Sequence, residues 1–544
     1  AFANATFDLS LDYNPDEQVD DRRLLWQELK LLNGRNADDP QIALLFATAT
    51  FNLSLAYVKN KNIDELRFLW KELKSLSERH PDNSDIAVEL AAIAFNLSVD
   101  DINNGAVEEA SMLCSDLKRL NERHAGNVKI VLDFANATFN LFLHYRNASQ
   151  IGKARQMWRE LKLLSERNAG NAEVALQFAR ATNNLEVAYG AAAQLRPARM
   201  LWKELKLLSE RYPDDAKLAG LLAMTTFNLS LHLRRSQQLG QMNALWSQLK
   251  SLSERHTGNA EVALQYALCT YNLSLDNIEK EQIEVAQSLW AELKSLYELH
   301  IDILEIARCF ARATFNLSLK FEDAQRDKVR VLWEALKSVS ERYEDAEDIA
   351  VMFATATFNL SVDYGEDQQW EEVWELWKEL KRLTEKYPHS VKIAMEFADA
   401  TSNLILHYRK EKSEEAHLLW KELRLLAKRH TGSLKIAVEF ASATFSLSLY
   451  YLEKEEIDLA GELWHELKSL SLEYGDDDEV AVEFSKVTFN VSVFYIHHQE
   501  MALAREFLQE LKQQRDRHVT NETIVKLYND LSAALDAEEF PEDV

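Results

Sequence analysis

Apolar and polar positions follow a helical period between residues 42 and 57. Apolar side chains recur in steps of four or seven at Ile42, Phe46, Leu53 and Tyr57, and a line of small residues runs beside them. Residues at these spacings lie on one face of an α-helix. The pattern therefore predicts a helix that buries one face.

A second helical pattern covers residues 63–79, where leucines recur at helical spacing. Its signature is Trp-x-Glu-Leu-Lys, as in Trp70–Lys74. The same five-residue segment occurs at Trp26–Lys30, Trp158–Lys162, Trp202–Lys206, Trp290–Lys294 and Trp377–Lys381, with divergent copies such as Cys114–Lys118, Trp246–Lys250, Trp333–Lys337 and Leu508–Lys512. Ten tryptophans fall in this register, flanked by leucines, which predicts that they lie in the core. Trp370 and Trp374 lie outside it; Trp370, placed in a connection, is the better candidate for an exposed anchor, although local packing is the favoured role.

Both patterns belong to one repeat, marked by Phe-Asn-Leu-Ser at residues 51–54. From Asp8, which fills the Asn position of the first copy, to Asn490 the step is 44 residues, shortened to 43 at 316–359 and 403–446. A fixed period of this size predicts a solenoid, which grows by stacking units and needs no single large core. Pro or Gly ends each second helix and Asn, Asp or Ser precedes the next first helix, as helix capping requires.

The predicted fold is all-α, an α-solenoid or superhelix of about twelve antiparallel helix pairs. Twelve repeats of 43–44 residues occupy residues 1–521, and residues 522–544 form a C-terminal capping helix with an acidic tail. Ala1–Phe7 aligns with Leu45–Phe51, so the chain begins inside a repeat. We therefore expect the first repeat to be truncated and the chain to be part of a longer polypeptide that carries an upstream effector domain.

The repeat resembles the tetratricopeptide family. Leu53-Ser54-x2-Tyr57 is similar to that family's Leu-Gly-x2-Tyr, Ala154-x3-Trp158 and Ala460-x3-Trp464 are similar to its Ala-x3-Phe, and Pro81, Pro213 and Pro388 correspond to its closing proline. The family repeat has about 34 residues, so this one is longer by about ten. HEAT repeats have a similar period and are the competing assignment. The tetratricopeptide resemblance implies that the first helices line a concave binding surface.

Charge and composition narrow the partners. The net charge is −26, from 62 basic and 88 acidic residues. Nucleic-acid binding relies on Lys and Arg at the phosphates, so we expect no nucleic-acid partner and favour a basic or neutral protein or peptide. The three cysteines are far apart and form no metal or disulfide pattern. No apolar run suggests a membrane span, and we expect a cytoplasmic protein without a membrane contact.

The Asn of each repeat is the candidate binding position. The positions one and two turns before it vary and are often polar, yet Asn persists at Asn52, Asn96, Asn140, Asn184, Asn228, Asn272, Asn316, Asn359, Asn403 and Asn490. An amide both donates and accepts hydrogen bonds and can grip a peptide backbone whatever its side chains. The resemblance implies a ladder similar to those of armadillo proteins, with side chains read by variable positions including Arg180, Arg312, Asp399 and Lys486. The alternative is that the amides bond between adjacent repeats and hold the first helices together.

The predicted function is a protein- or peptide-binding scaffold, in the form of a C-terminal ligand-sensing array of a larger signalling or defence protein. The alternative is a structural repeat protein that assembles into fibres. No phosphate-binding loop, metal-ligand spacing, nucleophile motif or paired acid and base occurs in the sequence. We therefore expect no catalytic residues, no metal, no cofactor and no enzymatic activity.

Overall fold

The computed structural model describes residues 2–12, 19–321 and 325–539, which form 25 α-helices. The chain divides into two compact units, residues 1–273 and 274–544, with the division inside α13. The helices of the first unit, with α13, are α1 (Phe2–Asp12), α2 (Val19–Arg35), α3 (Pro40–Lys59), α4 (Ile63–Arg79), α5 (Ser84–Asn103), α6 (Val107–Arg123), α7 (Val128–Asn147), α8 (Ile151–Arg167), α9 (Ala172–Ala191), α10 (Leu195–Arg211), α11 (Ala216–Arg235), α12 (Leu239–Arg255) and α13 (Ala260–Glu279). Those of the second unit are α14 (Ile283–Leu299), α15 (Leu304–Ser318), α16 (Arg326–Arg342), α17 (Glu347–Glu366), α18 (Trp370–Lys386), α19 (Val391–Tyr408), α20 (Ser413–Arg429), α21 (Leu434–Glu453), α22 (Ile457–Glu473), α23 (Asp478–His497), α24 (Met501–Arg517) and α25 (Glu522–Glu539).

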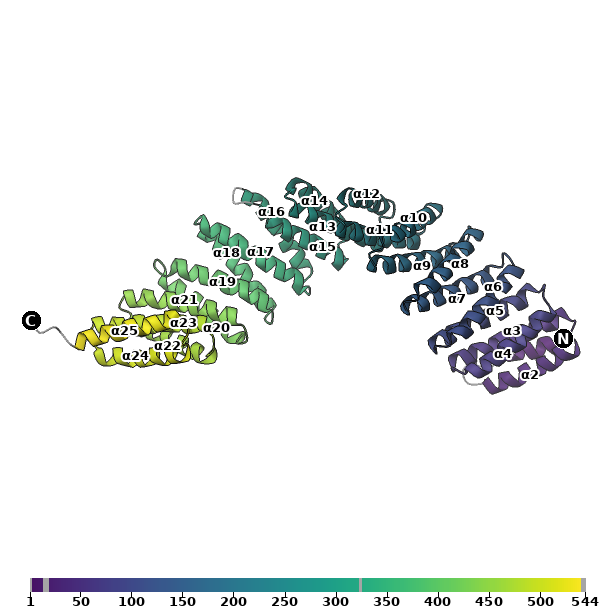
Figure 1. Cartoon of the computed structure of the whole chain (residues 1–544), viewed down its shortest axis with the longest axis horizontal. Helices are drawn as coiled ribbons and strands as arrows, with labels where there is room; N and C mark the ends of the chain where they lie inside the picture. The colour runs from purple at the N-terminus through teal and green to yellow at the C-terminus, as the bar shows by residue number, and fades with distance from the viewer. Residues whose placement is uncertain (1, 13–18, 322–324, 540–544) are drawn as a thin grey trace, which may run out of the picture. The chain divides into compact units, whose positions relative to one another are not determined.

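The helices alternate between two roles. The odd-numbered helices up to α23 are the first helices of the predicted pairs, and the even-numbered helices are the second helices. Within each unit a first helix packs against its own second helix and against neighbouring first helices, as α5 does against α6, α3 and α7. The helices follow one another in chain order along each unit (Figure 1). The predicted all-α solenoid of twelve helix pairs is therefore confirmed; residues 540–544 of the predicted acidic tail lie outside the described residues.

Capping side chains begin several of the first helices as the sequence predicts, whereas α15, α17, α19 and α21 begin without a side-chain cap. The Asn83 side chain accepts hydrogen bonds from the backbone N–H groups of Asp85 and Ile86, both at 3.1 Å. Asn127, Asn171, Asp215 and Asn259 cap their helices in the same way. Each satisfies backbone donors that the helix itself leaves unpaired.

The tryptophan line is part of the core, as predicted. In each of nine repeats the indole Nε1 donates to the hydroxyl of the threonine 24 residues later, for example Trp420 to Thr444 at 2.8 Å. The other pairs are Trp26–Thr50, Trp158–Thr182, Trp202–Thr226, Trp246–Thr270, Trp290–Thr314, Trp333–Thr357, Trp377–Thr401 and Trp464–Thr488. The hydroxyl in turn donates to a backbone carbonyl one turn earlier, as Thr50 does to Phe46 at 2.6 Å. This chain of bonds explains why Thr precedes Phe-Asn-Leu-Ser, since a buried indole N–H needs an acceptor.

Lys and Glu of Trp-x-Glu-Leu-Lys join adjacent second helices. Lys162 Nζ lies 2.6 Å from Oε1 of Glu204, the Glu of the next copy. Corresponding ion pairs are Lys30–Glu72, Lys74–Asp116, Lys118–Glu160, Lys337–Glu379, Lys381–Glu422, Arg424–Glu466 and Lys468–Glu510. We call this set the lysine–glutamate ladder. In the sequence these residues are only repeated letters of the Trp-x-Glu-Leu-Lys signature. In the structure each ion pair links one repeat to the next.

Helix α3 is an exception to the statement that no apolar run in the sequence suggests a membrane span. Among the described helices it alone has the length and composition of a membrane span, and 50% of the apolar window is buried within the structure. It packs against α2, α4 and α5. The first helices supply the apolar layer of each repeat, and α3 is the most apolar member of that layer.

Candidate ligand-binding surface

The ten asparagines lie near the middle of the first helices. Nine are half-buried and Asn403 is exposed. The neighbouring residues of the motif face the core: Leu53 is buried, and Ser54, also buried, donates its hydroxyl to the Phe51 carbonyl at 2.6 Å. Phe51 and Asn52 are half-buried, so the Asn is the polar member of the motif that reaches the surface of the first-helix layer. We call the ten residues the asparagine line.

Half of the asparagine line has no hydrogen-bond partner among the described residues. These unpartnered amides are Asn52, Asn96, Asn140, Asn359 and Asn403. A half-buried amide without a partner leaves two donors and an acceptor to water or to a ligand.

Other members of the line are held within the protein. Arg146 on α7 donates to Asn184 Oδ1 on α9 at 2.9 Å, and Asn184 Nδ2 donates to the Arg180 carbonyl at 2.8 Å. Arg234 on α11 makes the same inter-repeat contact with Asn272 at 3.3 Å. Asn490 bonds to a carbonyl of its own helix, and Asn316 also interacts within the chain. Inter-repeat contact, one of the two predicted roles of the amides, is therefore seen at Asn184 and Asn272, and ligand contact by the unpartnered amides stays a prediction.

The side chains at the four variable positions differ in their exposure and in their ion pairs. Arg180 and Arg312 are exposed, although Arg312 lies 4.0 Å from Asp348. Asp399 pairs with Lys435 at 2.8 Å, and Lys486 pairs with Glu483 at 2.8 Å. These two are half-buried. Arg180 is consequently the variable residue most accessible to a partner.

Two hollows border the variable positions of the first unit. One, of about 770 Å³, lies over α9, α11 and the start of α13, with Arg180, Leu221, Met224 and Lys217 in its lining. The other, of about 490 Å³, is lined by Thr48 and Glu89, among others, on α3 and α5. The surface beside the asparagine line is therefore concave at the positions that the sequence analysis assigned to side-chain recognition.

Half-buried carboxylates accompany the line. Burial raises the pKa of Asp133 to about 6, and it also raises the pKa of Glu89, where a hydrogen bond from Thr48 partly opposes the shift. In the second unit burial raises the pKa of Glu396 and of Glu439, and the nearby Asp399 adds to both. Carboxylates that are partly desolvated gain more from a nearby cation than exposed ones do.

One repeat departs from the others in a way that the sequence analysis missed. Glu186 on α9 occupies the position that Ser54 occupies on α3, and its side chain is fully buried. Its carboxylate makes no hydrogen bond of good geometry and lies 3.8 Å from Nε2 of His232 on α11. Burial raises the pKa of Glu186 to about 7, against a smaller opposite effect of the Asn228 amide.

Gly190 makes room for this pair. A Cβ at Gly190 would lie 1.8 Å from His232 Nε2, so the imidazole packs directly on the α9 backbone. One turn before Glu186, the side chain of Asn183 replaces the Phe of other repeats and accepts a hydrogen bond from Thr225 at 2.9 Å. Alignment of the repeats with one another would have found these three positions, because all three depart from the pattern in a single helix.

The residues that carry the resemblance take the expected places. In α21 and α22, Leu447, Ser448, Tyr451, Ala460 and Trp464 are all buried at the contact within the pair. These are the positions at which tetratricopeptide repeats bring small and large residues together. The chain is an all-α solenoid of helix pairs with a 44-residue repeat, in which these residues are packed as the resemblance to tetratricopeptide repeats implies.

Comparison with known proteins adds little to this assignment. No protein-family profile matches the chain, and no curated protein does. A solved structure from work on a phosphorylation switch in the interaction between cadherin and β-catenin is 13% identical, with a TM-score of 0.43, over 93% of this chain and 98% of that chain. The apo form of RapI is 13% identical, with a TM-score of 0.29, over 71% of this chain and 99% of its own. Yeast Tom70 is 11% identical, with a TM-score of 0.24, over 100% of this chain and 97% of its own. TM-scores this low do not establish a shared fold, so the assignment rests on the packing of the repeats.

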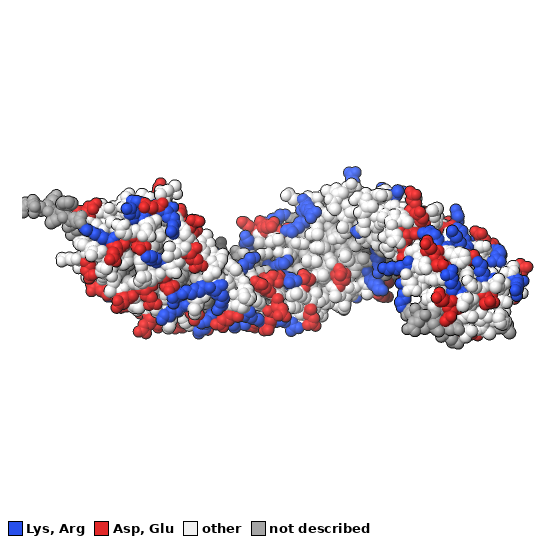
Figure 2. Space-filling model, turned by 90° about the horizontal axis from the view of Figure 1, so that it is seen from below, with Lys and Arg blue, Asp and Glu red and all other residues white. Residues whose placement is uncertain are grey.

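Acidic and basic side chains occur together on the face of the molecule drawn in Figure 2. The basic residues visible there form no extended field. A nucleic-acid interface requires such a field. The part of the surface that Figure 2 shows therefore has none of the electrostatics of a nucleic-acid-binding protein.

Proposed function

We propose that this protein binds an extended peptide or protein segment along the first-helix layer, with the unpartnered amides contacting the segment's backbone. The observation that carries the proposal is the set of five amides without internal partners among the described residues. Three of them, Asn52, Asn96 and Asn140, lie on consecutive first helices of one unit. That arrangement supports a continuous contact.

Two further features support a basic segment. Glu89 and Asp133 lie on the same helices as Asn96 and Asn140 and have raised pKa values. The net charge of −26 adds a long-range attraction for a cationic partner. A sensing role, in which binding is transmitted to an effector of the same polypeptide, is the form of this function that we favour, in the cytoplasm and without enzymatic activity or cofactor.

The test is a selection of peptides from a random library on the full chain, with counter-selection on the Asn52→Ala/Asn96→Ala/Asn140→Ala variant. We expect peptides enriched in Lys or Arg that bind the unaltered chain and are not retained by the variant. Each amide contact contributes about 0.5–1.5 kcal/mol, so loss of three lowers affinity by about tenfold or more. Selected peptides that bind both chains equally would contradict the proposal.

A further inference from the structure

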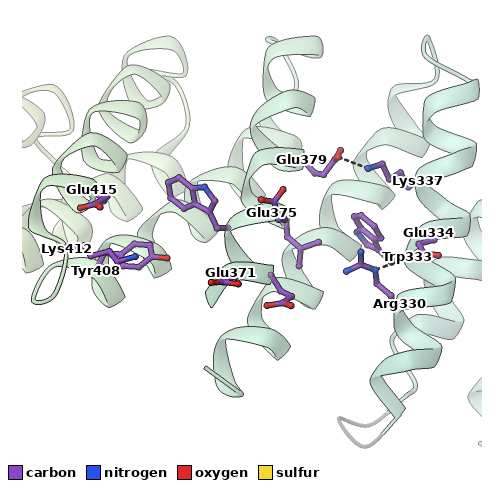
Figure 3. A pocket seen from close by; sticks show the side chains of 13 residues that line it. Arg330, Trp333, Glu334, Lys337, Glu371, Glu375, Glu379, Tyr408, Lys412 and Glu415 are labelled. Carbon is purple, nitrogen blue, oxygen red and sulfur yellow. Dashed lines mark hydrogen bonds and ion pairs between the residues drawn. The ribbon is translucent and has the colours of Figure 1, made fainter. Parts of the chain in front are cut away.

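A separate hollow lies over the second helices of the second unit. It has a volume of about 970 Å³ and is lined by residues of α16, α18 and α20 and by Tyr408 at the end of α19 (Figure 3). None of its residues belongs to the asparagine line or to the variable positions. Its size is that of a ligand-binding site.

An aromatic residue in the lining of this hollow replaces a cation of other repeats. Trp374 lies three residues before the core Trp377, at the position held by Arg in six other second helices: Arg23, Arg67, Arg155, Arg199, Arg330 and Arg505. Trp374 is half-buried, stacks on Trp377 with ring centroids 4.9 Å apart and meets Tyr408 edge-on at 6.2 Å.

The arginine at this position reaches the next second helix in two repeats. Arg23 pairs with Glu65 at 2.9 Å, and Arg199 donates to Gln241 at the same position of the next repeat. Arg67 and Arg330 pair elsewhere, with Asp101 and with Glu334. The residue that corresponds to Glu65 after Trp374 is Glu415, and with Trp at residue 374 no arginine stands where Arg23 stands for Glu65.

Carboxylates outnumber cations around Trp374. The lining contains six glutamates and three basic residues. Glu379 pairs with Lys337 at 2.6 Å and Glu334 with Arg330 at 3.3 Å, whereas Glu371, Glu372 and Glu415 have no ion pair among the described residues. These three lie in the first turn of their helices, where the helix dipole offsets part of their repulsion.

The aromatic faces of the hollow already hold cations of the protein itself. Lys412 Nζ lies 4.9 Å from the centroid of the Tyr408 ring, and Arg330 Cζ lies 4.9 Å from that of Trp333. Aromatic rings beside carboxylates are a favourable setting for a cation. Trp374 is the one aromatic of the lining that replaces an arginine of the other repeats.

We propose that this hollow is a second binding site, which takes an arginine or lysine side chain of a basic peptide segment against Trp374 and beside Glu371 and Glu415. The bound cation replaces the arginine that the other repeats supply from within the chain. The site lies on the second helices, whereas the proposed backbone contacts lie on the first helices.

The test measures binding of two fluorescent peptides to the full chain at 150 mM salt. One is an alternating Gly-Arg octapeptide, and the other has citrulline, which is uncharged and of similar shape, in place of each arginine. We expect Trp374→Arg, which restores the residue of the other repeats, and Glu371→Gln/Glu415→Gln to weaken binding of the arginine peptide at least tenfold. The citrulline peptide should bind at least tenfold more weakly to the unaltered chain.

The matched control is Glu210→Gln/Glu254→Gln, which makes the same change in net charge at exposed positions of α10 and α12. It should change the affinity by less than twofold. Equal losses in the control and the Glu371/Glu415 variant would show a non-specific attraction to an acidic protein and overturn the proposal. Unchanged binding to Trp374→Arg, with helicity retained by circular dichroism, would also overturn it.

Discussion

The two helices of each repeat carry equally regular polar residues that find different partners. On the second helices, Lys and Glu of the lysine–glutamate ladder meet each other, as in Lys162–Glu204 at 2.6 Å. On the first helices, the amides of Asn52, Asn96 and Asn140 have no partner among the described residues.

The difference shows why a repeated residue alone does not identify a site. A repeated pair whose members meet within the chain is explained by stacking of the repeats. A repeated Asn without a partner within the chain destabilises its helix, because Asn in the middle of a helix is less favourable than Ala by a few tenths of a kcal/mol. Hydrogen bonds to a ligand can offset this loss of stability.

The largest expected effect concerns the core beneath both faces. Trp420 is fully buried and donates to Thr444 at 2.8 Å. We expect Trp420→Ala to destabilise its repeat by about 3–5 kcal/mol through loss of packing and of the hydrogen bond to Thr444. Thermal unfolding followed by circular dichroism should show an early transition, whereas Trp374→Leu, at a half-buried position, should leave the melting temperature within a few degrees. Similar melting of the two variants would show that the tryptophan line is not the core.

The next effect depends on pH. The pKa of Glu186 is raised from 4.5 to about 7 in the folded state. Below pH 4.5 Glu186 is protonated in both the folded and the unfolded state and does not lower the free energy of unfolding. As the pH rises from 4.5 through 7, the unfolded state loses this proton first, and the free energy of unfolding falls by about 3 kcal/mol in all. Glu186→Gln stays neutral, so its gain in melting temperature over the unaltered chain should be large at pH 8 and small at pH 4. An equal difference at both pH values would contradict the assignment of a buried, unpaired carboxyl.

A smaller effect is expected for the lysine–glutamate ladder. Lys162 and Glu204 are partly exposed, and such pairs contribute about 0.2–1 kcal/mol. A double-mutant cycle of Lys162→Met and Glu204→Gln should give a coupling of this size that decreases in 1 M salt. A coupling near zero at low salt would mean that the ladder makes no contribution to stacking.

The smallest effect separates members of the asparagine line. Asn184→Ala removes the contact with Arg146 and should cost about 1 kcal/mol. Asn140→Ala removes no internal contact and should raise stability by a few tenths of a kcal/mol through helix propensity. Chemical denaturation of the two variants measures the difference, and equal destabilisation would mean that both amides hold repeats together.

Periodicity was sufficient to predict the fold, because the helices, their order and their caps depend on local spacing and on residues such as Asn83 that act within one turn. It was also sufficient to place the tryptophans in the core. It could not show which amides are free, because Arg146 reaches Asn184 across 38 residues and only the packed structure brings them together. The sequence identified Trp374 only as a tryptophan outside the register and did not identify Glu186. Both residues are informative because they break the repeat.

The most direct test of the central claim compares the two faces with one peptide. A peptide selected on the unaltered chain is titrated by calorimetry against Asn52→Ala/Asn96→Ala/Asn140→Ala and against Lys74→Met/Lys118→Met/Lys162→Met. The amide variant should lose at least tenfold in affinity with an unchanged or slightly higher melting temperature, and the lysine variant should melt earlier and bind within twofold. Full affinity in the amide variant together with a lower melting temperature would contradict the claim and show that the asparagines only hold the repeats together.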